Sequence, residues 1–183
     1  MNANTQRRIK ELIDRLGRLS AANDWEEDIN PTQWTALSYL ARANRFSRSP
    51  SQVADFMTAT RGTVSQTLKA LARKELISEI RSDQDKRSIS YSMTTKGEAL
   101  FQKTSTIEDA LSQMTNGETT PLLAGLEALL RSALKQNGQR AFGVCGTCKH
   151  YRKESLGGFC NLLSEPLSPA DAKQICHEHS EVA

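Results

Sequence analysis

The sequence has few aromatic residues and no long hydrophobic run. Phe, Trp and Tyr make up only 5% of its 183 residues, and 38% of the residues are hydrophobic. No stretch approaches the roughly 18 consecutive apolar residues that a membrane span requires. The polar residues 1–8 do not resemble a secretory signal peptide. We therefore expect a globular, cytoplasmic protein that does not bind a membrane.

Neither sign of charge dominates the chain, because 24 Lys and Arg stand against 21 Asp and Glu. The balance is uneven along the sequence: residues 31–96 carry 11 Lys and Arg against 5 Asp and Glu. The segments on either side have a slight acidic excess. A basic region of this kind is typical of a module that faces nucleic-acid phosphates, although a solvated basic face without a partner has the same composition.

Apolar residues recur with helical spacing in the first half of the chain. The segment 5–22 has one apolar face, and Asn30 followed by Pro31 is typical of the start of a second helix. Two more helices are predicted over residues 51–57 and 61–74, with a short turn between them. Their order and spacing predict a helix–turn–helix.

The hydrophobic period changes after the fourth predicted helix, where apolar and polar residues alternate. Two short strands are predicted at residues 77–81 and 88–94, joined by a charged turn in a β-hairpin. A fifth helix, beginning at Thr94 or Thr95, is expected to continue to the Asn116-Gly117 pair, which should end it.

A sixth helix, predicted over residues 120–135, carries a wide stripe of leucines. Such a stripe is either an ordinary core face or a seam between two copies of the chain. A chain this small has little else to cover it, so we favour a homodimer.

The fourth predicted helix has an apolar face made by Val64, Leu68 and Leu71, which lie close together on a helical wheel. Its other face is small and polar, as required for close entry into a DNA groove. Gln66 can bond adenine edges, and Lys69 suits the phosphate backbone. A polar helix face exposed only to water is the alternative. The candidate DNA-binding residues in this region are Thr60, Gly62, Thr63, Ser65, Gln66, Lys69 and Arg73.

The sequence resembles the MarR (multiple antibiotic resistance regulator) family. The segments that carry the resemblance are 30–34, 60–71, 75–77, 85–87 and 93–97. The resemblance implies a winged helix–turn–helix and a dimer built from the N- and C-terminal helices. It also implies a near-palindromic double-stranded DNA operator as the partner.

The family's wing pattern, Asp-x-Arg, falls here on Asp85 and Arg87. The resemblance implies that Arg87 reaches the DNA while Asp85 orients it. A charge-assisted bond between the two would restrict the guanidinium in this way. An ordinary surface ion pair, worth under about 1 kcal/mol, is the alternative.

We accordingly expect a mainly α fold with a small β-hairpin wing and four regions. An N-terminal dimerisation helix occupies residues 1–30, and the winged helix–turn–helix occupies 31–97. Dimerisation helices follow over 98–137, and a Cys-rich metal-binding segment covers 138–183.

All four cysteines lie in the last of these regions, with the spacing Cys145-x2-Cys148-x11-Cys160-x15-Cys176. Outside an oxidising compartment, such a group indicates metal or redox chemistry before disulfides. Most four-cysteine zinc sites use two Cys-x2–4-Cys pairs, whereas this segment has one pair and two single cysteines among apolar residues. That arrangement favours an iron–sulfur cluster over Zn²⁺, with a redox disulfide as a third interpretation.

The segment is also similar in outline to high-potential iron–sulfur proteins. The matching residues are the Cys-x-x-Cys pair, Tyr151, the stretch 158–162 and the last cysteine. The resemblance implies a [4Fe–4S] cluster. His150, His177 and His179 are then predicted to be outer-shell donors or surface residues, because four cysteines already complete a metal shell.

Two functional hypotheses follow from these patterns. The first is a DNA-binding transcription regulator whose [4Fe–4S] cluster senses redox state, nitric oxide or iron. The second is a MarR-type regulator that responds to a small aromatic ligand and holds a structural zinc ion. An enzyme is disfavoured, because the predicted DNA-binding region contains no catalytic Cys, no His pair and no phosphate-cradling Gly-rich loop.

Overall fold

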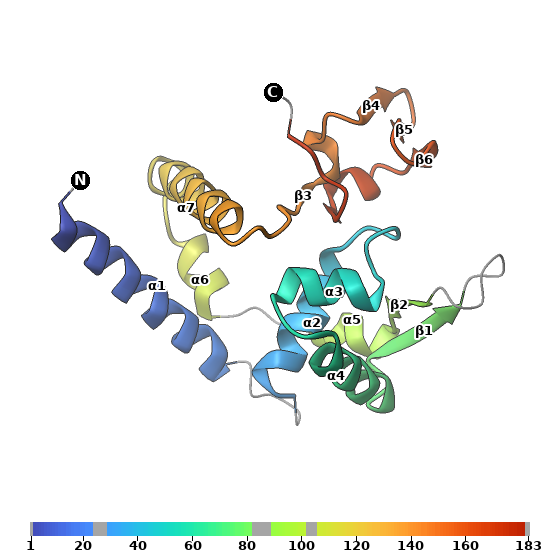
Figure 1. Ribbon diagram of the computed structural model, residues 1–183, viewed down its shortest axis with the longest axis horizontal. Helices are drawn as coiled ribbons and strands as arrows, with labels where there is room; N and C mark the ends of the chain where they lie inside the picture. Colours follow the sequence, from blue (N-terminus) through green and yellow to red (C-terminus); the bar gives the residue numbers. More distant parts are fainter. Residues whose placement is uncertain (1, 24–28, 82–88, 102–105, 182–183) are drawn as a thin grey trace.

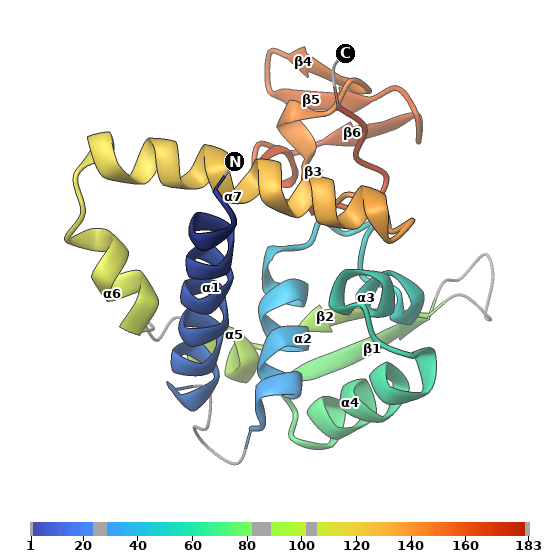
Figure 2. The same cartoon turned by 60° about the vertical axis from the view of Figure 1, so that its left-hand side comes forward.

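The computed structural model describes the chain except for residues 1, 24–28, 82–88, 102–105 and 182–183. Figure 1 shows three parts. A lobe within residues 31–101 lies beside a pair of long helices and below a small, β-rich part near the C-terminus. In the second view the C-terminal part lies above the lobe (Figure 2).

The helices of the lobe begin where local capping predicts. Helix α2 (Pro31–Arg42) follows Asn30, whose side chain accepts a hydrogen bond from the Gln33 backbone at 2.9 Å. Helix α3 (Pro50–Met57) has the same capping box, here from Ser49. Both starts place Pro in the first helical turn, where a missing N–H costs nothing.

Helix α4 (Arg61–Arg73) begins after Thr60, whose hydroxyl accepts from the Thr63 backbone at 3.2 Å. The hairpin of β1 (Ile77–Arg81) and β2 (Ile89–Met93) follows it, antiparallel, with Ile77 opposite Met93. Helices α2, α3 and α4 and this hairpin form the winged helix–turn–helix that the sequence predicts.

The core of the lobe lies between these helices and the hairpin. The apolar face predicted for α4 points into it, since Val64, Leu68 and Leu71 are completely buried. Tyr91 brings the hairpin into the same core, and its backbone N–H donates to the Arg48 carbonyl at 3.0 Å. The wing is therefore attached to the segment between α2 and α3.

The prediction that the Asn116-Gly117 pair ends a helix is wrong. The described residues of the predicted fifth helix form α5 (Thr95–Phe101) and α6 (Thr106–Ser112), and residues 102–105 lie outside the described part of the chain. The Asn116-Gly117 pair does not stop a helix but lies in the first turn of α7 (Asn116–Gln136). The physical reason is a capping box, in which Thr115 donates its backbone N–H to the Glu118 carboxylate at 2.9 Å.

Helices α1 (Ala3–Asn23) and α7 expose their apolar faces instead of burying them. A groove of about 590 Å³ runs between them, lined by Ile9 and Ile13 of α1 and by Leu122, Leu126 and Leu129 of α7. Within the described residues, no helix is both long and apolar enough to cross a bilayer.

The Cys-rich segment is a small folded unit of short strands, for which the sequence indicated no secondary structure. Strand β3 (Gly143–Val144) pairs with β7 (Ile175–Cys176). A separate sheet has the order β4 (Tyr151–Glu154), β5 (Gly157–Cys160), β6 (Glu165–Leu167). We call residues 143–181 the cysteine module.

Candidate nucleic-acid interface and metal centre

The outer face of α4 carries the residues predicted to contact DNA. Thr60, Gly62, Thr63, Gln66, Lys69 and Arg73 are exposed, and Ser65 is half-buried. The helix lies at the edge of the lobe, on the side away from the cysteine module (Figure 2). The arrangement places these side chains together on one accessible face, while their contact with DNA stays a prediction.

The first turn of α4 suits an anionic partner. It contains no acidic residue, so nothing on the helix offsets the positive end of its dipole. The hydroxyls of Thr60 and Thr63 lie 2.9 Å apart and hydrogen-bond each other. Arg61, which is not among the predicted DNA-binding residues, is exposed at the first position of the helix and adds a positive charge to its N-terminal end.

Asp85 and Arg87, the predicted wing pair, lie outside the described residues. In the described base of the wing, two side chains contact the Glu79 carboxylate. Arg81 forms an ion pair with Glu79 at 2.8 Å, and the Tyr91 hydroxyl donates to the same carboxylate at 3.4 Å.

All four cysteines are buried free thiols. Cys145 begins a short 3-10 turn, Cys148 follows that turn, Cys160 ends β5 and Cys176 ends β7. Cys145, Cys160 and Cys176 belong to one apolar cluster that also includes Leu167. The fold therefore brings together cysteines that are far apart in the sequence.

The thiols also interact electrostatically. Burial raises the pKa of Cys145 to about 12, and the charges of Cys176, Cys160 and Cys148 contribute to the rise. Among the described residues, however, no three His, Cys, Asp or Glu side chains are arranged to hold a metal ion. Four buried thiols are chemically suitable ligands for a metal group. Their sulfur atoms, however, are not arranged as the ligands of a metal ion are.

Two histidines have polar partners that are not cysteines. His177 is buried, and its Nε2 lies 3.1 Å from the Asp55 carboxylate of α3. His179 Nε2 lies 3.0 Å from the Thr147 hydroxyl. His177 thus contacts the DNA-binding lobe directly, which its sequence position did not indicate.

The cysteine module packs on the segment between α2 and α3. Arg45 of this segment donates to the Pro166 carbonyl at 2.8 Å and lies 3.4 Å from the Asp171 carboxylate. Phe142 completes the contact, with its ring edge-on to Tyr39 and Phe56. No local pattern in the sequence marks these contacts.

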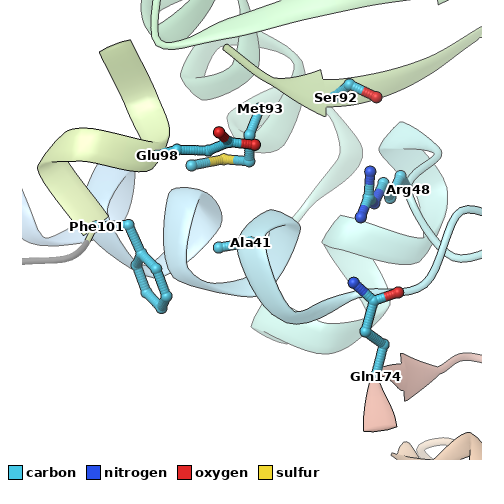
Figure 3. Close-up of a pocket in the computed structure, with 7 residues that line it drawn as sticks. All are labelled: Ala41, Arg48, Ser92, Met93, Glu98, Phe101 and Gln174. Atoms are coloured by element: carbon cyan, nitrogen blue, oxygen red, sulfur yellow. The ribbon is translucent and has the colours of Figure 1, made fainter. Parts of the chain in front are cut away.

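A separate pocket of about 390 Å³ opens between α2, α5 and β2 (Figure 3). Arg48 and Glu98 bring opposite charges to it, and Gln174 reaches it from the cysteine module. Burial lowers the pKa of the Arg48 guanidinium from its ordinary value. The remaining lining residues are Ala41, Ser92, Met93 and Phe101.

One family model and several solved structures are similar to parts of the chain. The MarR family model matches residues 27–88. The chain is similar to the S. aureus MepR–DNA complex, with 25% identity, 68% of this chain and 94% of that chain covered, and a TM-score of 0.54.

Two other solved structures share the fold. One is Streptococcus pneumoniae FabT in complex with DNA, with 24% identity, coverage of 72% and 99% of the two chains, and a TM-score of 0.56. The other is the MarR/EmrR family transcriptional regulator from Acinetobacter sp. ADP1, with 24% identity, coverage of 74% and 99%, and a TM-score of 0.56. A comparison with curated proteins found no match.

Proposed function

The chain carries a MarR-family domain at residues 27–88, and we propose that this regulator binds double-stranded DNA as a homodimer and senses a signal through its cysteine module. The exposed polar face of α4 is the observation that carries DNA binding. The MepR and FabT structures, which are DNA complexes, support the same assignment. We assign no catalytic reaction to this chain.

In this proposal α4 enters the major groove. Gln66 reads base edges, and Lys69 and Arg73 contact phosphates along the groove. Thr60, Gly62, Thr63 and Ser65 form the small N-terminal end that approaches the DNA backbone. Asp85 and Arg87 extend the contact from the wing.

The exposed faces of α1 and α7 support the homodimer. Leu126 is 46% exposed and Leu129 is 45% exposed, and both border the groove between the helices. An uncovered apolar stripe of this length is costly in water and is typical of an interface. A second copy would cover it and would place two α4 helices on a near-palindromic operator.

The cysteine module is proposed to hold an iron–sulfur cluster, [4Fe–4S], through Cys145, Cys148, Cys160 and Cys176. All four cysteines are buried, and Cys145, Cys160 and Cys176 pack together in one group of apolar side chains. This supports the role, because iron–sulfur clusters need thiolate ligands. When bound, the cluster would supply a centre that changes with oxidants, nitric oxide or iron supply. Since the module packs directly on the lobe, such a change would reach the DNA-binding helices.

The pocket in Figure 3 supports a second candidate function. A small aromatic acid could place its ring against Met93 and Phe101 and its carboxylate near Arg48, which would make the protein a ligand-responsive regulator. Four cysteines around Zn²⁺ would then have a structural role.

The deciding experiment is anaerobic purification followed by visible absorbance and metal analysis. A brown protein with about four irons per chain supports the cluster; a colourless protein with one zinc ion supports the alternative. Operator affinity should then be compared for the metal-loaded protein, the metal-free protein and a Cys160→Ala variant. Identical affinities in all three would show that the module has no sensing role.

A further inference from the structure

The chain joins the pair of long helices, α1 and α7, to the lobe at three places. Helix α1 leads into α2, and α5 leads through α6 into α7. After α7 the chain returns to the lobe at Phe142, the residue before β3. In Figure 2 α2 begins at the bottom of the lobe, whereas β3 lies above it. Two connections would leave the lobe free to turn about the line between them, and a third connection away from that line prevents the turn.

Phe142 fixes the lobe end of this third connection. Its ring packs edge-on against Phe56, with the ring centroids 5.3 Å apart, and against Tyr39, at 5.9 Å. Tyr39 is completely buried in the core of the lobe, and edge-to-face pairs stabilise beyond the area that they bury. The backbone N–H of Asn44 donates to the Ile175 carbonyl at 2.9 Å, which holds the strand paired with β3 on the same lobe.

The helix end of the connection is fixed by a C-cap. Gly138 has a φ of +62°, the left-handed conformation that glycine adopts without strain. Its backbone N–H donates to the Lys135 carbonyl at 3.3 Å, and that of Gln139 donates to the Leu134 carbonyl at 2.9 Å. This is a Schellman motif, and it sets the direction in which the chain leaves α7.

The chain between the two ends is short. Three residues, 139–141, lie between Gly138 and Phe142. The steps from Gly138 to Phe142 span at most about 14 Å, even when fully extended. Within this segment, the Arg140 guanidinium forms an ion pair with the Glu178 carboxylate of the cysteine module at 3.2 Å. The lobe therefore cannot carry Phe142 more than this span away from the end of α7.

We propose that residues 138–142 are a tether that holds the DNA-binding lobe in one orientation on the dimerisation helices, with Phe142 as the anchor. The inference rests on the proposed binding of DNA by a homodimer. It adds that the tether fixes the separation of the two α4 helices, so that the dimer accepts one spacing between the half-sites of its operator. Phe142 then determines specificity without contacting DNA, through packing alone.

The test lengthens the tether without changing its ends. A Gly/Ser insertion of six residues between Gln139 and Arg140 keeps the cap and the anchor, and it raises the span to at most about 36 Å. The preferred operator is selected from random duplex DNA with the unmodified, full-length protein. Its centre is then lengthened or shortened by one and two base pairs. Each added base pair moves one half-site by about 3.4 Å and turns it by about 35°.

We expect the unmodified protein to bind the altered operators at least about 100-fold more weakly than the preferred one, because a dimer that reaches one half-site loses the gain of bivalent binding. The insertion variant should lose less than about 10-fold on the same DNAs, since each lobe can follow its half-site. The matched control carries the same insertion between Ser155 and Leu156, in the turn from β4 to β5, where Leu156 is 90% exposed. It should discriminate between the spacings as the unmodified protein does.

Phe142→Ala releases the anchor instead of lengthening the tether, and it should tolerate the altered spacings in the same way. Its control is Phe159→Ala, which removes a half-buried ring of the cysteine module that lies beneath Arg152. If Phe142→Ala does not fold, the tether insertion carries the test, because it removes no side chain.

The outcomes separate the tether from the function on which it rests. Tolerance of altered spacing in the tether insertion, with strict spacing in the turn insertion, supports the proposal. A tether insertion that discriminates as sharply as the unmodified protein would overturn the tether and leave dimeric DNA binding in place. If the unmodified protein binds a single half-site as tightly as the whole operator, or binds no DNA, the proposed function fails and the inference fails with it.

Discussion

The His177 imidazole lies 3.1 Å from the Asp55 carboxylate, so the residue after the last cysteine contacts helix α3 of the DNA-binding lobe. The ring of Phe142 packs edge-on against the same imidazole. The contact joins two parts of the chain that are 122 residues apart. It links the cysteine module to the helix that precedes α4.

Asp55→Ala should loosen this link without unfolding the lobe. The Asp55 side chain is 48% exposed, so we expect a loss of no more than about 1 kcal/mol in the free energy of unfolding. Hydrogen exchange should quicken at residues 175–177. Asp14→Ala, which removes an exposed ion pair within α1, is the control. Unchanged exchange at residues 175–177 in Asp55→Ala would show that the contact does not hold the module.

Gln66→Ala should reduce discrimination between operator sequences. A good base contact from this position is worth about 1–3 kcal/mol. The variant should therefore bind the preferred operator more weakly, whereas its affinity for random DNA should be unchanged. Binding of both DNAs is measured at one fixed salt concentration. An equal loss on the two DNAs would mean that Gln66 contacts the backbone rather than a base.

Lys69→Ala should weaken binding to every DNA sequence to a similar extent. Losing one phosphate contact lowers the slope of log affinity against log salt concentration by about one. The exposed Lys149 of the cysteine module provides a control, since Lys149→Ala removes the same charge far from α4. A slope that is the same in Lys69→Ala and in Lys149→Ala would contradict the predicted interface.

Leu126→Glu should convert a dimer into monomers. Leu126 is 46% exposed and lines the groove between α1 and α7, so a carboxylate there would be buried against the partner copy at high cost. Sedimentation velocity measures the change in mass. The control is Leu162→Glu, because Leu162 has a similar exposed fraction, 47%, and lies in the cysteine module. If Leu126→Glu has the same mass as Leu162→Glu, the dimer surface lies elsewhere.

Leu68→Ala should destabilise the lobe strongly. Leu68 is completely buried on the inner face of α4, and removing such a side chain leaves a cavity that costs about 2–5 kcal/mol. Urea unfolding monitored by tryptophan fluorescence gives the free energy. Lys69→Ala, at the next position on the outer face, should change it by less than about 0.5 kcal/mol. Similar losses for the two variants would contradict the assigned faces of α4.

Local patterns in the sequence determined most of the winged lobe. Asn30 with Pro31 specified the start of α2, because capping and a fixed φ act within one turn. The spacing of Val64, Leu68 and Leu71 specified which face of α4 is buried. One local signal was misread, since Thr115 and Glu118 form a capping box that begins a helix where the Asn116-Gly117 pair was expected to end one.

Only the tertiary structure decided how the cysteines relate to the lobe. The sequence grouped the four cysteines and predicted a common site, but it contains no sign that Asn44 would hydrogen-bond to Ile175 or that Ser47 and Asp55 would contact His177. Capping and helical periodicity are short-range and leave a readable pattern. Contacts across more than a hundred residues are set by how whole elements pack, so they leave no fixed spacing in the chain.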